Sequence, residues 1–359
     1  MTAINRLDIS RIRNINELSF IPGKQINLIH GVNGSGKTSI LEAIHLLAVG
    51  RSFRSTKSTT PLIQHNSKDC TVFVNLDVNL SIGLQKTRNH KPLLKLQGEK
   101  QANWIEVAHL LPVQVIDSNT FRLLEGSPKD RRRFLDWGVF HVEPSFVTHW
   151  RNSRKCIANR NLLLKNGRPD KDQLQAWNTE LCIEAELVDR ARETYFSEYL
   201  PTFEEVLDKL GTIRDISISY RRGWDEQLTL AEVLERNKGV DLKYGSTQNG
   251  PHRADIIVKH EGISAVDVLS RGQQKMLVSA LKLAQGAFLS QVANRRCVFL
   301  IDDLPAELDD YNRASICHFL QSLSSQIFMT SVDDESLKNS WESTALITKF
   351  HVEHGKILS

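Results

Sequence analysis

The sequence predicts an α/β fold in which a mixed sheet with flanking helices and a β-rich subdomain is interrupted by a helical arm. Three observations predict it: apolar strands that precede helices at both ends of the chain, a strictly alternating run in the first third, and a middle rich in helix formers. A chain of 359 residues exceeds one ordinary domain of about 100–200 residues. We therefore expect one discontinuous domain from residues 1–125 and 241–359, and an inserted helical domain from residues 126–240.

The first part of the chain predicts a strand, a glycine-rich turn and a helix. Residues 26–29 are an apolar strand, and residues 38–49 carry apolar side chains at helical spacing. From Val72 to Leu84 apolar residues alternate strictly. This run is longer than the usual strand of about 3–10 residues, so we expect a bend or hairpin within it.

The middle of the chain predicts two antiparallel helices. Helix formers fill residues 131–199, with one break at Asn166–Pro169. Pro201 is expected to end the second helix, because proline removes a backbone donor. Thr202 and Glu205 have the offset of a capping box for a short further helix, and Gly211 would end it.

The last third returns to alternating strands and helices. A strand is expected at residues 256–258, a long helix from Ser270 to about Val292, and a helix at residues 311–323. Residues 297–301 are wholly apolar, as in a buried parallel strand. A strand at residues 326–329 and a closing β segment follow.

Composition narrows the class of protein. Apolar residues make up 40% and charged residues 25%, which is ordinary for a globular chain and unlike a disordered or rod-like one. Five dispersed cysteines indicate neither a disulfide framework nor a zinc site, and they fit a reducing cytosol. The start does not resemble a signal peptide, and no segment reaches the ~18 apolar residues of a membrane span. We expect a cytoplasmic protein without a membrane partner.

Positive charge is concentrated in one stretch. The whole chain carries 46 − 42 = +4, whereas residues 121–170 carry eleven Lys/Arg and five Asp/Glu, or +6. The stretch permits a nucleic-acid partner, although a solvated helix face with internal ion pairs explains any single residue equally well.

Gly31–Thr38 matches the pattern G-x-x-x-x-G-K-[ST]. Glycines let backbone N–H groups turn inward around a phosphate, and the following helix directs its positive end at the same anion. Lys37 would reach the β- and γ-phosphates, and the Thr38 hydroxyl would bind Mg²⁺. An ordinary glycine-rich turn is the alternative.

A second motif, made of two acidic residues, follows the apolar strand Val298–Ile301. The strand ends in Asp302 and Asp303, at the edge of a sheet where phosphates bind. Asp302 would hold Mg²⁺ through water, and Asp303 would orient or deprotonate an attacking water. Alone this is a weak signal; together with the glycine loop it is a strong one.

Leu269–Gln274 resembles the L-S-G-G-Q signature of the ABC ATPases, and Ala306–Asp309 resembles their D-loop. The resemblance implies an ABC-type P-loop ATPase head. In that superfamily the signature binds the γ-phosphate of ATP held by the other subunit. An insertion of about 115 residues is absent from transporter ATPases and far shorter than the coiled coil of chromosome-maintenance proteins, which points to the RecF family of bacterial DNA-gap repair ATPases.

Further stretches over nearly the whole chain resemble the RecF family. They are Arg11–Asn14, Gly50–Arg54, Glu125–Asp136 and Gly250–Arg253. The resemblance implies a weak, DNA-stimulated ATPase that uses ATP and Mg²⁺ and dimerises on ATP. It also implies binding of double-stranded and gapped DNA, and work with RecR and RecO to load RecA.

The resemblance assigns roles to individual residues. Expected nucleotide contacts are Asn33, Gly34, Ser35, Gly36, Lys37, Thr38, Ser39 and Arg13, with Lys37 and Asp303 catalytic. Expected contacts in the partner subunit's site are Ser270, Arg271, Gly272 and Gln273, with Asp309 in the D-loop. Expected DNA contacts are Arg51, Arg54, Arg131, Arg132 and Arg133.

The chain also departs from the superfamily pattern. Arg271 stands where glycine is usual, and Asp303 stands where transporters have glutamate, so we expect slow hydrolysis. No histidine follows residues 328–329, which leaves Thr330 or Ser331 as the γ-phosphate sensor. Gln114 is the expected metal-contacting residue beside Thr38 and Asp302, with residues 117–119 equally placed.

Two other functions remain open at this point. One is an ATPase subunit of a membrane transporter, which would need a transmembrane partner. The other is a monomeric P-loop phosphotransferase, whose activity would survive a change of Ser270 to arginine.

Overall fold

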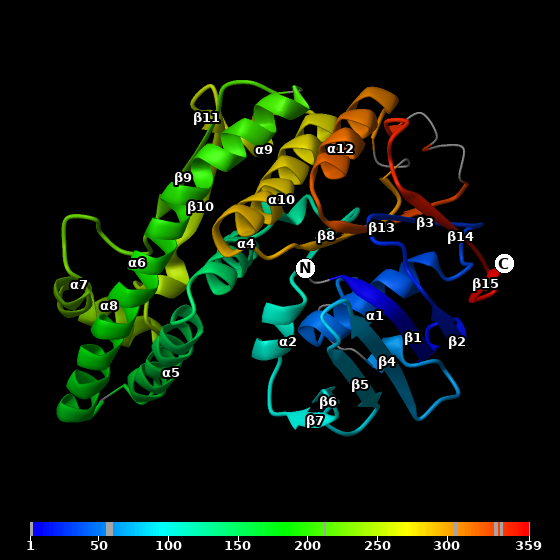
Figure 1. The fold of residues 1–359 in the computed structure, drawn as a ribbon. Coiled ribbons are helices and arrows are strands. Elements are labelled where there is room, and N and C mark those ends of the chain that lie inside the picture. Colours follow the sequence, from blue (N-terminus) through cyan, green and yellow to red (C-terminus); the bar gives the residue numbers. More distant parts are fainter. Residues whose placement is uncertain are drawn as a thin grey trace. The chain divides into compact units, whose positions relative to one another are not determined.

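The chain forms two compact units in the computed structural model, which describes residues 3–54, 60–167, 169–211, 213–304, 308–333, 337 and 340–358. The head unit comprises Met1–Thr120, Val206–Ile213 and Arg271–Ser359, and the arm unit comprises Phe121–Glu205 and Arg214–Ser270. Figure 1 traces the chain through both, coloured along the sequence.

A six-stranded sheet carries the phosphate-loop strand of the head unit. Its order is β15-β14-β3-β13-β12-β8, and all neighbours are parallel except the β14–β15 hairpin, so the sheet is mixed. The strands are β3 (Ile26–His30), β8 (Val113–Ile116), β12 (Val298–Ile301), β13 (Gln326–Ser331), β14 (Ile347–Glu353) and β15 (Lys356–Leu358). Strands β3, β12 and β13 confirm the predicted apolar strands, and their central position explains their apolar composition.

A second six-stranded sheet in the head unit is antiparallel, in the order β2-β1-β4-β5-β6-β7. Its strands are β1 (Ile4–Ile12), β2 (Ile15–Phe20), β4 (Asp69–Leu76), β5 (Ser81–Thr87), β6 (Leu93–Leu96) and β7 (Glu99–Gln101). The long alternating run is the β4–β5 hairpin, as expected, with Val72 opposite Leu84. Val72, Val74, Ile82 and Leu84 of the alternating set are buried, whereas Val78 lies in the turn and is 47% exposed.

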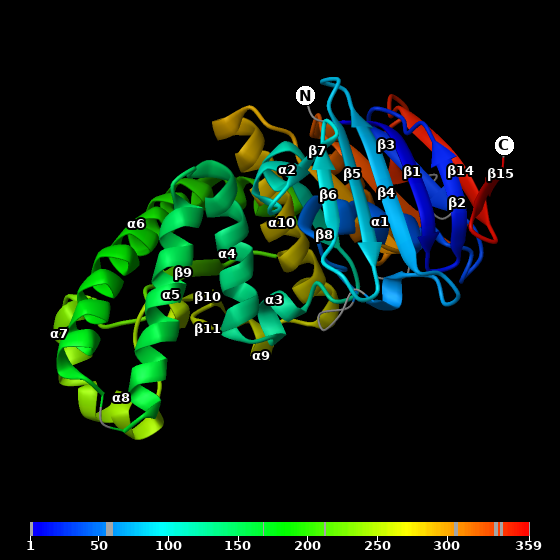
Figure 2. The same cartoon turned by 90° about the horizontal axis from the view of Figure 1, so that it is seen from below.

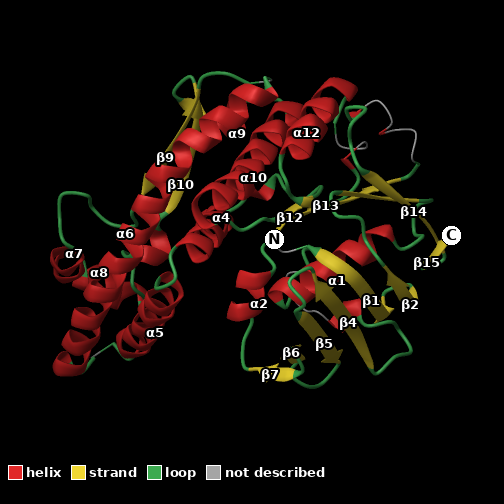
Figure 3. Cartoon of the chain, in the orientation of Figure 1, coloured by secondary structure: helices red, strands yellow, loops and turns green. Residues whose placement is uncertain are grey.

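Helix α1 (Lys37–Val49) contacts both sheets, β13 on one side and β1, β4 and β5 on the other. Figure 2 shows it behind the antiparallel strands, and Figure 3 shows α10 (Arg271–Ala293) and α12 (Asp310–Ser322) on the opposite side of the parallel sheet. The head unit also holds α2 (Ile105–Leu110) and the single turn η1 (Thr60–Leu62). By length and composition α10 could span a membrane, contrary to expectation, but 72% of its apolar window is buried, which is typical of a core helix.

The arm unit is mainly helical. Its helices are α3 (Arg122–Glu125), α4 (Pro128–Val142), α5 (Phe146–Lys165), α6 (Lys171–Leu210), α7 (Leu230–Arg236), α8 (Lys238–Tyr244) and α9 (Ala265–Val268). The turn η2 (Pro251–Arg253) leads into a sheet of order β11-β10-β9, made of β9 (Ile216–Arg221), β10 (Asp255–His260) and β11 (Ile263–Ser264). The last five residues of α6 are grouped with the head unit.

Two helix predictions for this region were wrong. A further break separates α4 from α5 at Glu143–Ser145, where Pro144 interrupts the pattern. Helix α6 runs through Pro201 to Leu210, so the expected cap at Thr202 does not form. The buried rings of Tyr195, Tyr199 and Phe203 recur at helical spacing and stack, which favours the helix on both sides of the proline.

The domain limits also differ from the expected ones. Residues 241–270, expected in the discontinuous domain, lie in the arm unit. Strand β10 pairs along its whole length with β9 and contacts α4, so this segment shares the arm's contacts.

Candidate functional site

The phosphate loop, Gly31–Thr38, joins β3 to α1. Gly31, Gly34 and Gly36 have φ values of 148°, 80° and 120°, a region that favours glycine. A Cβ at Gly31 would stand 2.2 Å from the Val352 carbonyl oxygen, so no larger residue fits there. Helix α1 begins at Lys37 with no side-chain cap, which leaves its first N–H groups directed at the loop.

Two buried polar groups suit this loop to a phosphate. The Ser35 hydroxyl is buried, and no hydrogen-bond partner for it is found in the described part of the chain. Lys37 is 7% exposed, and its Nζ donates to the carbonyls of Gly31 at 2.5 Å and Val32 at 3.0 Å. Burial lowers the pKa of the Lys37 ammonium, and the charges of Asp303 and Asp302 act against this. A phosphate oxygen is the ligand that these donors lack.

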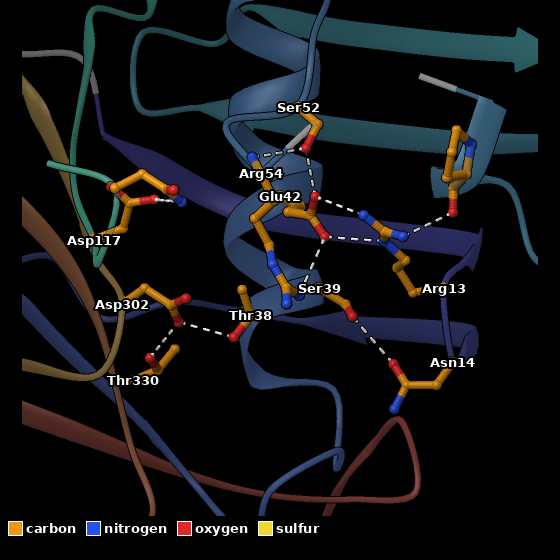
Figure 4. A network of polar contacts seen from close by, with 12 residues as sticks. Arg13, Asn14, Thr38, Ser39, Glu42, Ser52, Arg54, Asp117, Asp302 and Thr330 are labelled. Atoms are coloured by element: carbon orange, nitrogen blue, oxygen red, sulfur yellow. Dashed lines mark hydrogen bonds and ion pairs between the residues drawn. The ribbon is translucent and has the colours of Figure 1, made fainter. Parts of the chain in front are cut away.

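Thr38 and Asp302, predicted separately as metal ligands, meet in the structure. The hydroxyls of Thr38 and Thr330 each donate to Asp302 Oδ1 at 2.8 Å, as Figure 4 shows. Burial raises the pKa of Asp302, and these two hydrogen bonds oppose the rise. The pair suits Mg²⁺, which takes few protein ligands and completes its shell with water and phosphate. A cluster of three or more His, Cys, Asp or Glu side chains able to hold a metal is absent from the described residues.

Thr330 positions the two aspartates. Its side chain is fully buried; besides donating to Asp302, its Oγ1 accepts from the Asp303 amide at 2.9 Å. These contacts favour an aspartate-positioning role for Thr330 over that of γ-phosphate sensor. Asp303 itself has φ 54°, a conformation rare outside glycine and concentrated at functional sites.

Gln114 and Asp117 are the two candidates for a metal contact beside Thr38 and Asp302, and their surroundings differ. Gln114 is buried, and its Nε2 donates at 2.8 Å to Gln285 Oε1 of α10. Asp117 follows β8, and its charge raises the pKa of Asp302. The Asp302 amide also donates to the Ile116 carbonyl at 2.9 Å, which holds the two strand ends together. The geometry therefore favours Asp117 over Gln114.

A buried carboxylate that the sequence analysis did not single out lies under the loop. Glu42 of α1 is 0% exposed. Arg13 Nε and Nη2 each donate to it at 3.1 Å, and the Ser52 hydroxyl donates at 2.5 Å. Arg54 Nη1 lies 3.9 Å from Glu42 Oε2 (Figure 4). The signal in the sequence was an acid among the apolar residues 40–44 of a helix.

These contacts bear on two predicted roles. Arg13, expected at the nucleotide, also donates from Nη1 to the Pro61 carbonyl at 3.0 Å, so all three guanidinium nitrogens have a partner within the fold. Arg54, expected at DNA, lowers the pKa of Asp302 and so lies near the Thr38–Asp302 pair.

Two hairpin turns form hydrogen bonds with the phosphate loop and the start of α1. In the β1–β2 turn, Asn14 Nδ2 donates to the Gly34 carbonyl at 2.7 Å, and Asn14 Oδ1 accepts from the Ser39 hydroxyl at 3.1 Å. In the β14–β15 turn, the Gly355 amide donates to the Ser35 carbonyl at 2.7 Å. The loop is thus shaped by chain segments on both sides of it.

The signature-like segment Ser270–Gln273 is exposed at the start of α10, whereas the next residue, Gln274, is buried. Asp309, expected in the D-loop, is the N-cap of α12: its Oδ1 accepts from the Asn312 amide at 2.9 Å. Hydrogen bonds from Asn312 lower the pKa of Asp309. Residues 305–307, which carry the rest of that motif, lie outside the described residues.

The arginines expected at DNA have different surroundings. Arg131 forms a two-bond ion pair with Asp255 at 2.7 and 2.9 Å, and its side chain is 16% exposed. Arg132 is half-buried and donates to the Ala254 carbonyl at 2.7 Å. Arg133 is 45% exposed beside Asp130, and Arg51 is exposed. Arg131 and Arg132 therefore fasten α4 to the start of β10.

Comparison with known proteins gives relatives over the full length. A family model described as the RecF/RecN/SMC N-terminal domain matches residues 3–357. The DNA replication and repair protein RecF of Pseudomonas syringae pv. tomato is 41% identical over 99% of this chain and 98% of its own. The RecF protein of Pseudomonas putida is 42% identical with the same coverage.

Solved structures share the fold. The recombination mediator protein RecF with ATP, of the RecFOR pathway, aligns with a TM-score of 0.87 at 22% identity, covering 99% of this chain and 98% of that one. An Smc head bound to a ScpA winged-helix domain aligns with a TM-score of 0.58 at 16% identity, covering 99% and 97%. The predicted fold class, an ATPase head with an inserted helical arm, is confirmed.

Proposed function

The chain belongs to the RecF family of DNA replication and repair proteins, and from this membership we propose that it is an ATP-switched DNA-binding protein of recombinational repair and replication-gap processing. The observation that carries the proposal is the meeting of Lys37, Thr38 and Asp302 at one glycine-rich loop, beneath the uncapped start of a helix. This arrangement binds a nucleoside triphosphate with a divalent cation.

The chemistry is ATP hydrolysis used as a switch. Bound Mg²⁺, between Thr38 and Asp302, would neutralise charge on the phosphates. Lys37 holds the phosphate oxygens, and Asp303 orients or deprotonates the attacking water. An aspartate reaches less far than a glutamate, so hydrolysis is slow. The ATPase activity is stimulated by DNA, as proposed for a DNA-dependent switch.

The exposed segment Ser270–Gln273 completes the site of a second copy. ATP held on the loop of one subunit is contacted by this segment of the other, so ATP favours a homodimer. The dimer clamps duplex DNA near single-strand/double-strand junctions, and hydrolysis releases it. In the cytoplasm, at the nucleoid, this switch would assist RecR and RecO in loading RecA.

Contacts with the duplex come from phosphate-binding arginines without base readout. Of the five arginines predicted, Arg133 and Arg51 are exposed and suited to this role. Arg54, near Asp302, suits the nucleotide better. Arg131 and Arg132 contribute to the arm's stability instead.

Sedimentation velocity tests the switch. Wild type, Lys37→Met and Ser270→Arg are each run with and without ATP and Mg²⁺, and with a duplex that carries a single-stranded gap. Wild type is expected to dimerise with ATP and to bind the DNA. Lys37→Met should lose nucleotide binding or use, and Ser270→Arg should bind ATP without dimerising. A wild-type protein that stays monomeric with ATP and DNA contradicts the proposal and favours a monomeric phosphotransferase.

A further inference from the structure

The outer face of the antiparallel sheet, turned away from α1, carries a row of residues that crosses four strands. Phe73 on β4 lies opposite Gly83 on β5, Gly83 opposite Lys95 on β6, and Lys95 opposite Lys100 on β7. We call these four residues the platform row. In Figure 2 the strands that carry it stand in front, with α1 behind them.

Phe73 is a large aromatic residue on the solvent side of its strand. It is 36% exposed, while its neighbours Val72 and Val74 are at most 1% exposed on the inner side. A Cβ at Gly83 would stand 3.7 Å from Phe73 Cδ2, so the ring extends over the glycine of the next strand. The adjoining outward positions are small or polar, namely Thr71, Asn75, Ser81 and Gln85. The Phe73 ring is therefore flanked by small or polar outward residues.

Two lysines end the row with uncompensated charge. Lys95 and Lys100 are exposed and directly opposite each other, and neither has an ion pair or hydrogen bond with any residue that the structure describes. Like charges in this position destabilise a sheet by about 0.2–1 kcal/mol. The nearest acid along the row, Asp8, is already paired with Arg6 at 3.0 Å. The face therefore attracts an anion.

We propose, building on the function proposed above, that this face binds single-stranded DNA. One base stacks on Phe73, and the sugar–phosphate chain runs toward Lys95 and Lys100. At a strand spacing of about 4.8 Å the lysines stand roughly 10 and 14 Å from the ring, within reach of successive phosphates. Bases in a duplex are stacked on one another and cannot reach Phe73, so the face selects the single-stranded part of a gapped substrate.

The stacking contact is tested by fluorescence anisotropy of a labelled oligothymidylate with the full chain, without nucleotide. Loss of one aromatic–base stack costs about 1–3 kcal/mol, so Phe73→Leu is expected to weaken binding at least about fivefold. Phe73→Trp, which keeps an aromatic face, should bind like wild type. Equal binding by Phe73→Leu and wild type overturns the proposal.

The phosphate contacts are tested by the salt dependence of the same binding. Each phosphate contact on a single strand contributes about 0.7 to the slope of log K against log salt. Lys95→Ala/Lys100→Ala should therefore lower the slope by about 1.4, whereas Phe73→Leu should leave the slope unchanged. The matched control is Lys24→Ala/Lys356→Ala, which removes two exposed charges beside the other sheet and should change neither affinity nor slope.

Separate measurements test whether the lysine variant still folds and whether it still dimerises with ATP. Lys95→Ala/Lys100→Ala should melt no lower than wild type, because it removes a repulsion. Its ATP-driven dimerisation and its affinity for fully paired duplex should match those of wild type. A loss of duplex binding equal to the loss of oligothymidylate binding overturns single-strand selection. A wild type that fails to dimerise with ATP contradicts the switch alone, because the platform is measured without ATP.

Discussion

Glu42 places a carboxylate with no exposed surface inside α1, one turn beyond the phosphate loop. Its two oxygens accept from Arg13 and Ser52, and Arg54 lies nearby. A buried charge is tolerated only when it is paired and hydrogen-bonded, so this group ties the β1–β2 turn and the segment after α1 to the helix.

Glu42→Gln should lower the free energy of unfolding of the head unit by about 2 kcal/mol, because charge-assisted bonds are lost and Arg13 keeps an unbalanced charge. Urea unfolding measures it. The control is Glu17→Gln at an exposed position of β2, expected within about 0.5 kcal/mol of wild type. An equally small effect of Glu42→Gln would show that the network contributes little.

His252 makes the stability of the arm depend on pH. Its Nε2 lies 2.9 Å from the Thr247 carbonyl and acts there as donor, and its Nδ1 is buried without a partner in the described residues. Burial lowers the pKa of His252 to about 4, and the charges of Arg253 and Arg132 also lower it. A proton on Nδ1 would make the imidazole cationic beside the positive charges of Arg253 and Arg132.

The unfolded chain takes up that proton near pH 6.5 and the folded protein only near pH 4. The free energy of unfolding should therefore be unaffected above pH 6.5 and fall as the pH drops from about 6.5 to 4, by up to about 3 kcal/mol. His252→Gln should reduce the fall across this window. Denaturant unfolding at pH 7.5 and pH 5 gives the difference; equal falls in both proteins would contradict the assignment.

At the scale of the element, α10 connects the signature-like segment to the sheet edge that carries Asp117 and Asp302. Lys282 donates to the Val115 carbonyl, and Gln285 accepts from Gln114, so the helix is joined to β8, which leads to Asp117. The helix approaches β12 closely because Gly286 has no side chain: a Cβ there would stand 2.4 Å from Phe299 Cζ.

Gly286→Ala should therefore destabilise the head unit by about 1–3 kcal/mol, as overpacking a filled core does. The matched control is Gly239→Ala in α8, where a Cβ meets nothing within 4 Å and helix propensity favours alanine by up to about 1 kcal/mol. Thermal unfolding of both variants checks the pair. A neutral Gly286→Ala would mean that α10 can shift away from β12.

Sequence patterns predicted the elements that are determined by spacing and alternation within a short segment. The phosphate loop, α1, the β4–β5 hairpin and the apolar strand before Asp302 were all predicted from spacing and alternation. Contacts between residues distant in the chain were predicted only where motifs named both partners, as for Thr38 and Asp302. Arg131 was expected at DNA from its basic surroundings, but only the fold brings Asp255 to it, 124 positions away. Pro201 is a helix breaker by itself, yet buried aromatic residues on both sides keep α6 continuous.

At the scale of the whole molecule, each unit has its own apolar core. One cluster surrounds α1 between the head's two sheets, and another joins Cys156, Leu181 and Trp224 in the arm. Chains with more than one core commonly depart from two-state unfolding, so we expect two transitions. Only the head unit contains the phosphate loop.

ATP with Mg²⁺ should therefore raise the melting temperature of one calorimetric transition and leave the other in place. At ligand concentrations 100 times the dissociation constant, binding adds about 2.7 kcal/mol to the stability of the unit that binds. Lys37→Met should abolish the shift. A single transition that moves as a whole would mean that the two units unfold together.

The contact between Gly355 and Ser35 has a consequence for synthesis. The two residues are separated by 355 − 35 = 320 positions, yet the turn that holds Gly355 shapes the loop. At about 5–20 residues per second, a ribosome needs roughly 15–60 s between them. During that interval the nascent chain carries the glycine loop without its brace, so ATP cannot help the head unit to fold until nearly the whole chain has been made.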